Sequence, residues 1–456
     1  MANTRMAVIG MGYVGIPAAA LFADVPGFEV TGIQRRSARS GWKIDFLNQG
    51  RSPFPETEPE IGELIRRVAL EKRTFRVTDD IEEAGRAQVI LIDVQTPVDE
   101  QHVPRYDSLK EVCTQIGQRL APGCLVCVES TVAPGTTVHV VKPILEERSG
   151  MQAGKDFSLS FSYERVMVGR LLHNIRNYPR IVGGLTPACG ERAAELYRNI
   201  VKAPVVVTDC LTAEVAKTVE NAYRDVNIAF ANEIALICES LGVDVYEVRQ
   251  LVNNLPNDPS NPSANPVRNM HMPGAGVGGH CLPKDSWLLK YGVDTYGSVP
   301  VDSKILINAR KVNDFMPVHM AEMAATTLIH EGVPLSSAKV AILGYSFLEN
   351  SDDTRNTPAK ILVDELISRK IVNIVIHDPF VRKEEMPNIF RDLTEALRGA
   401  HCACLVTAHS EYRKKKLIEA LRLMKSAIII DGRNVLPRDI AGIHVITIGA
   451  SKKERS

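Results

Sequence analysis

Residues 6–15, MAVIGMGYVG, decide the fold of the N-terminal part of the chain. A short apolar run leads into glycines with GxGxxG spacing at Gly10, Gly12 and Gly15, and a helical stretch over 13–23 follows. At such a turn the first glycine permits the tight bend, the second lets the backbone approach a pyrophosphate, and the third allows close helix packing. Amides at the helix start then face the phosphates. We therefore expect a dinucleotide site that includes Gly10, Gly12, Tyr13, Val14 and Gly15.

Outward from this motif, apolar β runs alternate with amphipathic helical runs, which is the pattern of a doubly wound parallel sheet. The clearest further strands of this unit are predicted over 28–34, 88–94, 124–131, 157–164 and 180–184, with a helix over 108–120. A second α/β unit begins near Ala338, with strands over 339–345, 373–379, 402–407, 427–433 and 444–449. Its first strand lacks the phosphate-binding glycine spacing, so we expect it to bind something other than a dinucleotide or to share that work with the first unit.

Between the two units, a proline-free stretch from about Thr212 has apolar residues at helical spacing and predicts one helix of nearly thirty residues. A helix of that length commonly joins domains or forms a dimer interface. The predicted fold is therefore α/β, with two Rossmann-like doubly wound domains joined by a long central helix. We place an N-terminal domain at 1–205, a central helical region at 206–330 and a C-terminal domain at 331–456, and we expect a homodimer or higher homo-oligomer.

The second predicted strand ends at Gln34-Arg35-Arg36, where an Asp or Glu would bind the ribose diol of NAD. Gln34 can still hydrogen-bond a diol, whereas a nearby arginine such as Arg35 suits the 2′-phosphate of NADP. NAD is the favoured cofactor and NADP stays open.

Composition excludes several classes of protein. Lys+Arg and Asp+Glu number 54 each, so no global basic field exists for nucleic acid. No apolar run approaches the roughly 18 residues that span a bilayer, and the first ten residues lack a secretory signal. Nine scattered cysteines argue against a disulfide framework. Cys124 and Cys127 fall in a predicted strand, where an offset of three points them to opposite faces, against a metal pair. We expect a cytoplasmic protein without a metal, nucleic-acid or membrane partner.

The segment 265–285, NPVRNMHMPGAGVGGHCLPKD, predicts a nucleophile at Cys281. Glycines let a loop pass close to a ligand, and the cationic neighbour Lys284 favours the thiolate. The alternative for a single cysteine is a small buried hydrophobe. On the long helix, Lys217 and Asn221 stand four apart and share a face with Glu214. They are either oxyanion-stabilising groups or an ordinary solvated surface, and the residues alone leave both open.

Eight motifs, in order, make the chain resemble the UDP-glucose/GDP-mannose dehydrogenase family over essentially its full length. They are GMGYVG (10–15), the Thr96-Pro97 loop, ESTVAPGTT (129–137), SYERVMVGR (162–170), EVAKTVENAYR (214–224), GVGGHCLPKD (276–285), SDDTRNTP (351–358) and DGRN (431–434). The resemblance implies a four-electron oxidation that consumes two dinucleotides. A sugar C6 alcohol becomes an aldehyde, Cys281 adds to it, and a thioester forms and is hydrolysed to the uronate.

The resemblance also implies residue roles. Lys217 and Asn221 would stabilise oxyanions, Asp285 would orient a water or Lys217, and Glu164 would help to hydrolyse the thioester. Thr131 would lie beside the nicotinamide. Further cofactor contacts are implied at Thr96, Pro97, Ser130 and Thr131, with Gln34 and Arg35. Substrate contacts are implied at Glu164, Arg165, Val166, Lys217, Asn221, Arg268, His271, Gly278, Arg355 and Arg433, the two last around the UDP of the C-terminal domain.

Departures from the UDP-glucose pattern bear on the substrate. Val168 replaces a second glutamate, Tyr163 replaces a proline, Leu348 replaces a lysine, and His280 precedes the nucleophile where a tyrosine is usual. Together with ERVMVGR and QRRS, they look most like the members that act on UDP-N-acetylmannosamine, for surface polysaccharide or glycan precursors. UDP-N-acetylgalactosamine, UDP-N-acetylglucosamine and UDP-glucose stay open as alternatives.

Two other classes remain to be separated. The β-hydroxyacid dehydrogenases share an N-terminal dinucleotide fold and a helix with Lys and Asn, but they have an all-helical C-terminal part. A non-catalytic nucleotide-sugar sensor would be expected to lose Cys281, Lys217 or Asn221, and all three are present.

Overall fold

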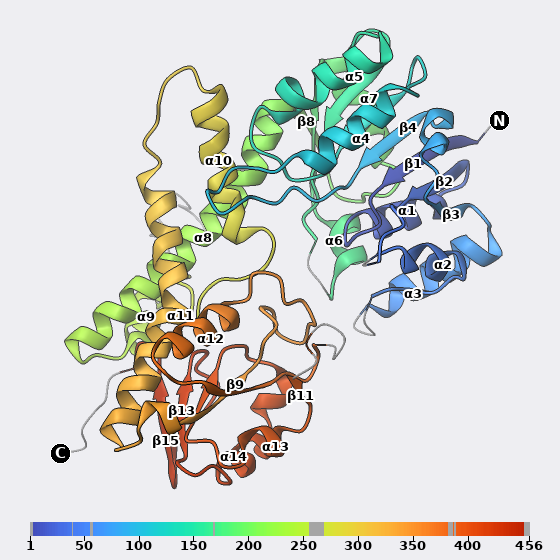
Figure 1. The fold of residues 1–456 in the computed structure, drawn as a ribbon. Coiled ribbons are helices and arrows are strands. Elements are labelled where there is room, and N and C mark those ends of the chain that lie inside the picture. The colour runs from blue at the N-terminus through green and yellow to red at the C-terminus, as the bar shows by residue number, and fades with distance from the viewer. Residues whose placement is uncertain are drawn as a thin grey trace. The chain divides into compact units, whose positions relative to one another are not determined.

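The computed structural model describes residues 3–38, 40–54, 58–166, 169–254, 269–381, 386 and 389–450. The chain divides into two compact units. The first comprises Met1–Glu220 and Trp287–Val301, and the second comprises Asn221–Ser286 and Asp302–Ser456. Each unit is built around its own sheet (Figure 1).

The first unit holds a sheet of eight strands in the order β3-β2-β1-β4-β5-β6-β7-β8. All neighbouring pairs are parallel except β6 and β7. The strand order reverses between β1 and β4, which is where doubly wound sheets bind ligands. The strands are β1 (Thr4–Ile9), β2 (Phe28–Ile33), β3 (Phe75–Thr78), β4 (Val89–Ile92), β5 (Leu125–Val128), β6 (Ser158–Phe161), β7 (Arg180–Gly184) and β8 (Val205–Asp209).

Helices cover both faces of this sheet because its strands are apolar on both sides. Along β1, Met6 and Val8 enter one core while Ala7 and Ile9 enter the other. One face is covered by α1 (Gly15–Asp24), α2 (Trp42–Asn48), α3 (Pro59–Arg66), α6 (Leu171–Asn177) and α7 (Pro187–Tyr197), and the other by α4 (Asp107–Gly117) and α5 (Lys142–Ser149) (Figure 1). Cys124 and Cys127 enter opposite cores, as the strand offset predicts.

The second unit holds seven strands in the order β11-β10-β9-β12-β13-β15-β14, parallel except for β14 with β15. They are β9 (Lys339–Leu343), β10 (Asn373–His377), β11 (Ile389–Phe390), β12 (Cys402–Leu405), β13 (Ile428–Asp431), β14 (Asp439–Ile440) and β15 (Ile443–Thr447). One core forms under α11 (Lys304–His330) and α12 (Pro358–Ser368), and the other under α13 (Leu393–Leu397) and α14 (Lys415–Leu421).

The middle of the chain is helical and comprises α8 (Cys210–Leu241), the shorter α9 (Val245–Asn253), α10 (Leu282–Tyr296) and α11. Within the second unit, α8 and α11 lie side by side (Figure 1). Arg310 of α11 forms a buried ion pair with Asp225 of α8 at 2.5 Å, and Asn232 donates to Asn313 at 2.9 Å. Polar pairing at these positions fixes the register of the two helices because an unpaired buried group is costly.

The α/β fold with two Rossmann-like sheets is confirmed, and so is the long central helix, which has 32 residues. Both sheets also contain strands that the sequence patterns did not single out, namely β3, β8, β11 and β14. The domain limits at 205/206 and 330/331 stay a prediction. Within the described residues, no helix has both the length and the apolar character that crossing a membrane requires.

Candidate active site

The three motif glycines occupy the positions that a dinucleotide loop requires. Gly10 has a φ of 110°, and a Cβ there would lie 2.2 Å from the carbonyl oxygen of Asp93. A Cβ on Gly15 would lie 2.0 Å from the carbonyl oxygen of Gly10. At Gly12, in contrast, a Cβ would meet no atom within 4 Å. The flanking glycines are thus required by packing, whereas the middle one leaves open space where a pyrophosphate fits.

Gln34, at the end of β2, holds the glycine loop. Its Oε1 accepts the amide of Met11 at 3.0 Å, and its Nε2 donates to Ser40 Oγ at 3.1 Å. Arg35 is exposed, and Arg36 forms exposed ion pairs with Asp79 and Asp45. Gln34 therefore stabilises the conformation of the glycine loop, at the position where an Asp or Glu would be expected.

The other predicted cofactor residues lie after β4 and β5, beside the switch point. Thr96 donates its hydroxyl to the carbonyl of Thr131 at 2.5 Å, and Ser130 donates to the carbonyl of Val94 at 2.8 Å. Pro97 accepts the amide of Arg105 at 2.8 Å. The hydroxyls of Thr96 and Ser130 thus tie the two loops together at the carboxyl end of the sheet.

In the first unit the structure brings Glu164 and Lys217 together. The Lys217 ammonium donates to the backbone carbonyl of Glu164 at 3.2 Å and lies 5.1 Å from the Tyr163 ring centroid. Lys217 is 7% exposed and Glu214 is fully buried, so the reading of this helix face as a solvated surface is wrong. Glu164 is buried and forms an ion pair with Arg180.

Glu214 anchors the start of α8 to the turn before α5. Its carboxylate accepts the amides of Gly135 and Thr137 at 2.6 and 2.8 Å, and the Thr137 hydroxyl at 2.6 Å. Burial raises the pKa of this carboxyl to about 7. Since all its contacts are to the protein's own backbone and hydroxyl, Glu214 has a structural role.

In the second unit Cys281 stands at the start of α10. Its carbonyl accepts the amides of Lys284 and Asp285 at 3.0 and 2.9 Å, so the thiol lies at the positive end of a 15-residue helix. All nine cysteines lie in the described part of the chain, and eight are buried whereas Cys281 is partly exposed. Cys281 thus combines partial exposure with a place at a helix N-terminus, a setting that in proteins favours the thiolate form of a cysteine.

Asn221, which is half-buried, and the buried Asp285 form a polar pair beside this helix start. Asn221 Nδ2 donates to Asp285 Oδ2 at 2.5 Å, and Lys284 Nζ lies 3.0 Å from Asp285 Oδ1. Asp285 therefore fixes both an amide and an ammonium. Lys217 and Asn221 lie one turn apart on α8.

The glycine-rich loop before Cys281 is fixed to its surroundings by backbone contacts. The Gly274 amide donates to Asn232 Oδ1 at 2.9 Å, and the Gly279 amide donates to the Arg355 carbonyl at 2.9 Å. At Gly276 the φ is 113° and a Cβ would lie 2.9 Å from Pro317. A Cβ on Gly278 would lie 2.5 Å from Phe347. The glycines thus let the loop pass close to α11 and to the 347–358 segment.

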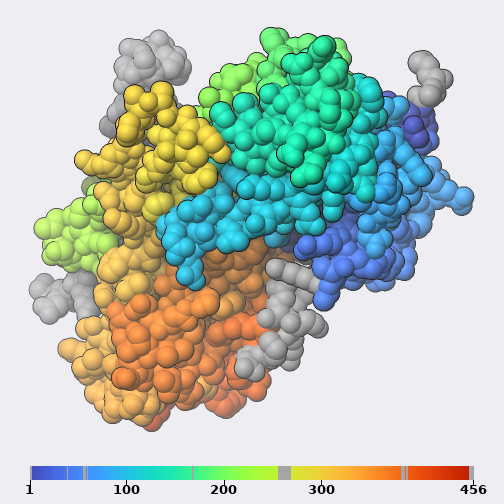
Figure 2. Space-filling view, turned by 45° about the horizontal axis from the view of Figure 1, so that its top comes forward, coloured from blue at the N-terminus to red at the C-terminus, as the bar shows by residue number. Residues whose placement is uncertain are grey.

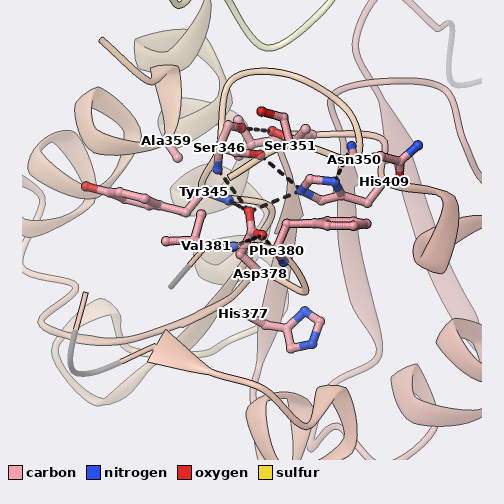
Figure 3. A network of polar contacts seen from close by, with 12 residues as sticks. Tyr345, Ser346, Asn350, Ser351, Ala359, His377, Asp378, Phe380, Val381 and His409 are labelled. Carbon is pink, nitrogen blue, oxygen red and sulfur yellow. Dashed lines mark hydrogen bonds and ion pairs between the residues drawn. The ribbon is translucent and has the colours of Figure 1, made fainter. Parts of the chain in front are cut away.

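A buried network fixes the loop that leads to Arg355 (Figure 3). Asp378 accepts the amides of Tyr345 and Ser346 at 2.7 and 2.9 Å, and it contacts His409 Nε2 at 3.1 Å. Hydrogen bonds to His409 and to these amides hold the pKa of the Asp378 carboxyl well below its usual range despite burial. Ser346 Oγ faces the same His409 nitrogen at 3.2 Å, while the other ring nitrogen accepts the Asn350 amide at 2.9 Å. Because serine and aspartate meet one nitrogen, this is a loop anchor and no proton relay.

The remaining predicted substrate residues are distributed over both units. Arg355 pairs with Asp353 at 2.5 Å, and Arg433 donates to the Val406 carbonyl at 2.7 Å, both in the second unit. His271 is exposed in that unit. In the first unit Arg165 pairs with Glu220 at 2.9 Å, and Val166 packs against the core. Arg268 lies outside the described residues.

Arg180 and Glu129 form a buried charged cluster, with Asp93 beside Glu129, that sequence reasoning missed. Arg180 opens β7 in the run RIVGG, and an arginine at a buried strand position was the available signal. Only the antiparallel pairing of β7 with β6 brings this arginine beside Ser162 and Glu164.

The two Rossmann-like sheets and the arrangement of the site residues are those of a nucleotide-sugar dehydrogenase. The chain belongs to the UDP-glucose/GDP-mannose dehydrogenase family: residues 4–201 match its NAD binding domain, 211–315 its central domain and 341–438 its UDP binding domain. It is an NAD-dependent nucleotide-sugar dehydrogenase. The β-hydroxyacid dehydrogenase alternative is thereby excluded, and the expectation that the second unit binds something other than a dinucleotide agrees with the UDP binding domain.

Among nucleotide-sugar dehydrogenases, the chain is similar to enzymes named for N-acetylated sugars. The chain is 35% identical to the UDP-N-acetyl-D-mannosamine dehydrogenase of Pyrococcus horikoshii over 98% of this chain and 99% of the relative. The solved structure of that enzyme superposes with a TM-score of 0.87. The crystal structure of an NDP-N-acetyl-D-galactosaminuronic acid dehydrogenase from Methanosarcina mazei Go1 is 41% identical, with a TM-score of 0.85 and coverage of 99% and 96%.

Proposed function

We propose that this protein oxidises the C6 alcohol of a UDP-N-acetylhexosamine, with UDP-N-acetyl-D-mannosamine as first choice, to the uronate through a covalent Cys281 intermediate. The observation that carries the proposal is the placement of Cys281, the one partly exposed cysteine of nine, at the N-terminus of α10 beside Lys284 and the Asn221–Asp285 pair. A dehydrogenase needs such a thiol only when an aldehyde must be oxidised further.

The residues divide the chemistry among them. NAD held at the glycine loop of the first unit would supply hydride acceptance, and the complete oxidation of an alcohol to a carboxylate would require two such cofactors. Lys217 and Asn221 stabilise negative charge on the C6 oxygen, since an ammonium and an amide donor one turn apart on α8 suit an oxyanion. The Cys281 sulfur bonds to the aldehyde carbon, and the carbon is released from sulfur when water hydrolyses the thioester. Glu164 takes the proton from that water, and the Cys281 thiolate leaves.

The substrate class rests on the relatives and on residues near the nucleophile. Relatives over nearly the whole chain bear the names of UDP-N-acetyl-D-mannosamine and NDP-N-acetyl-D-galactosaminuronic acid dehydrogenases. The chain also carries His280 and Val168 where the UDP-glucose pattern has a tyrosine and a glutamate. The manno epimer is preferred because several relatives with that name match this chain over 98% of its length.

We further propose a cytoplasmic homodimer. On α8, the exposed apolar residues Tyr223, Phe230, Ile237 and Leu241 recur at intervals of seven, seven and four, the spacing of a helix-packing seam. Exposed apolar residues also occur on α9, the yellow-green segment in Figure 2, where Leu251 is 66% exposed. Nine free cysteines fit a reducing compartment.

The test is turnover with UDP-N-acetylmannosamine, its gluco and galacto epimers and UDP-glucose, each with NAD and NADP. Reduced dinucleotide is counted per sugar for the wild type, Cys281→Ala and the control Cys238→Ala, which changes a buried cysteine of the second unit. We expect two per sugar with NAD and an N-acetylhexosamine, a loss of at least a hundredfold in Cys281→Ala, and little change in Cys238→Ala. Oxidation of none of the four sugars, or two hydrides undiminished without the Cys281 thiol, contradicts the proposal.

A further inference from the structure

A buried charged cluster lies beneath the carboxyl end of the first unit's sheet, and of its members the proposed chemistry assigns a role only to Glu164. At its centre the Arg180 side chain is 2% exposed. Its guanidinium forms ion pairs with Glu129 and Glu164 and stacks on Tyr197 at 3.8 Å from the ring centroid. These groups come from four separate elements of the chain, so one arginine joins them.

Arg180 is held in a single orientation by its own hydrogen bonds. Its Nε donates to Ser162 Oγ at 2.8 Å, and one Nη donates to the Ser162 carbonyl at 3.1 Å. The Tyr197 hydroxyl donates to Glu129 at 2.7 Å and so fixes the second carboxylate. A planar guanidinium with this many fixed donors transmits its position to each partner, as a flexible ammonium cannot.

The charges in the cluster indicate which residue orients the Glu164 carboxylate. Asp93, whose Oδ2 atom is buried, lies beside Glu129, and burial together with that carboxylate raises the pKa of Asp93. The single Arg180 cation forms ion pairs with two carboxylates, Glu129 and Glu164. Lys217 approaches only the backbone carbonyl of Glu164. The Glu164 carboxylate therefore takes its orientation from Arg180.

We propose that Arg180 is a positioning residue for the hydrolytic half of the reaction, fixing the Glu164 carboxylate through a guanidinium that Glu129, Ser162 and Tyr197 lock in place. The inference rests on the proposed function. In the step concerned, the water oxygen bonds to the thioester carbon, its proton passes to Glu164, and the carbon–sulfur bond breaks to release the Cys281 thiolate and the uronate. Arg180 itself touches neither substrate nor water in this scheme.

The experiment separates the oxidation steps from hydrolysis. Rapid-mixing kinetics with the best substrate and NAD give the burst of reduced dinucleotide and the steady-state rate, and intact mass spectrometry after acid quench measures the sugar adduct on Cys281. The variants are Arg180→Lys, Glu164→Gln and the double variant. Arg192→Lys is the control, since Arg192 also donates to Ser158 Oγ and the Gly123 carbonyl in this unit but does not contact the cluster.

We expect Arg180→Lys to keep the burst rate within about threefold, lower the steady-state rate at least tenfold and accumulate the adduct. Glu164→Gln should show the same signature, and the double variant should be no slower than Glu164→Gln alone. Three results would overturn the proposal. They are equal losses of the burst rate and the steady-state rate in Arg180→Lys, kinetics of Arg180→Lys that match those of Arg192→Lys, and a double variant whose loss equals the product of the two single losses. If Arg180→Lys does not fold, Tyr197→Phe must show the same signature more weakly, and its absence overturns the proposal. Failure of the proposed function is recognised separately, because the wild type then forms neither reduced dinucleotide nor adduct, and both proposals fall.

Discussion

At the scale of single residues, His280 is the residue next to the nucleophile whose ionisation the fold controls. Burial, followed by the nearby Lys284 and Arg355 cations, lowers the pKa of His280 to about 4. In the unfolded chain the same group titrates near 6.5. Between pH 4 and pH 6.5 the unfolded chain binds more protons at this group than the folded chain does. The contribution of His280 to the free energy of unfolding is therefore complete above pH 6.5 and is lost as the pH falls towards 4.

This sign predicts the behaviour of a substitution. The unfolding free energy of the wild type should fall more between pH 6.5 and 4.5 than that of His280→Asn, by up to about 2 kcal/mol. Denaturant titrations at the two pH values measure the difference. His330→Asn, at the exposed end of α11, is the control and should follow the wild type. Equal slopes for His280→Asn and wild type would show that the imidazole titrates normally.

Residues also show where sequence reasoning ended. Cys281, Lys217 and Asn221 could be singled out because each belongs to a local motif, a glycine-rich loop or a helical i,i+4 pair. Arg180 could not, because its partners come from distant positions that only the sheet brings together. Glu214 lies on the same helix face as Lys217 and Asn221, but its carboxylate accepts hydrogen bonds from the amides of Gly135 and Thr137.

At the scale of elements, buried strands were predictable because both of their faces are apolar. The edge strands β3 and β8 of the first sheet were not, since an exposed residue interrupts β3 and β8 has no fully buried position. Helix α11 carries Pro317 in its interior, which in a sequence favours a break. There the helix continues, and Pro317 packs beside Gly276.

The glycine loop gives a paired prediction at this scale. Gly12→Ala should fold with the melting temperature of the wild type but bind NADH at least tenfold more weakly, about 1.4 kcal/mol, because the methyl group fills the open space of the loop. Gly15→Ala should instead lose about 2 kcal/mol of stability, because its Cβ would meet the Gly10 carbonyl. Fluorescence titration and thermal melting separate the two effects. Normal NADH binding by Gly12→Ala would place the phosphates elsewhere.

At the scale of the whole molecule, the apolar seam of α8 predicts assembly. Light scattering after size exclusion should give twice the chain mass for the wild type, and Phe230→Asp should shift it to the monomer, because a carboxylate in an apolar contact is costly. Val372→Asp is the matched control, since Val372 is 68% exposed but belongs to the segment just before β10 and not to α8. A dimer that survives Phe230→Asp places the interface on another surface.

The Arg180 cluster has a consequence for how the first unit assembles. Its members come from the ends of β4, β5 and β6 and from the start of β7, so they meet only when those strands take their native order and direction. A compact misfolded sheet would bury at least one of these charges alone, at a cost of several kcal/mol. Apolar strands of similar composition pair almost interchangeably, whereas the cluster accepts a single arrangement. Arg180 thus favours the native strand order over other arrangements of the same strands.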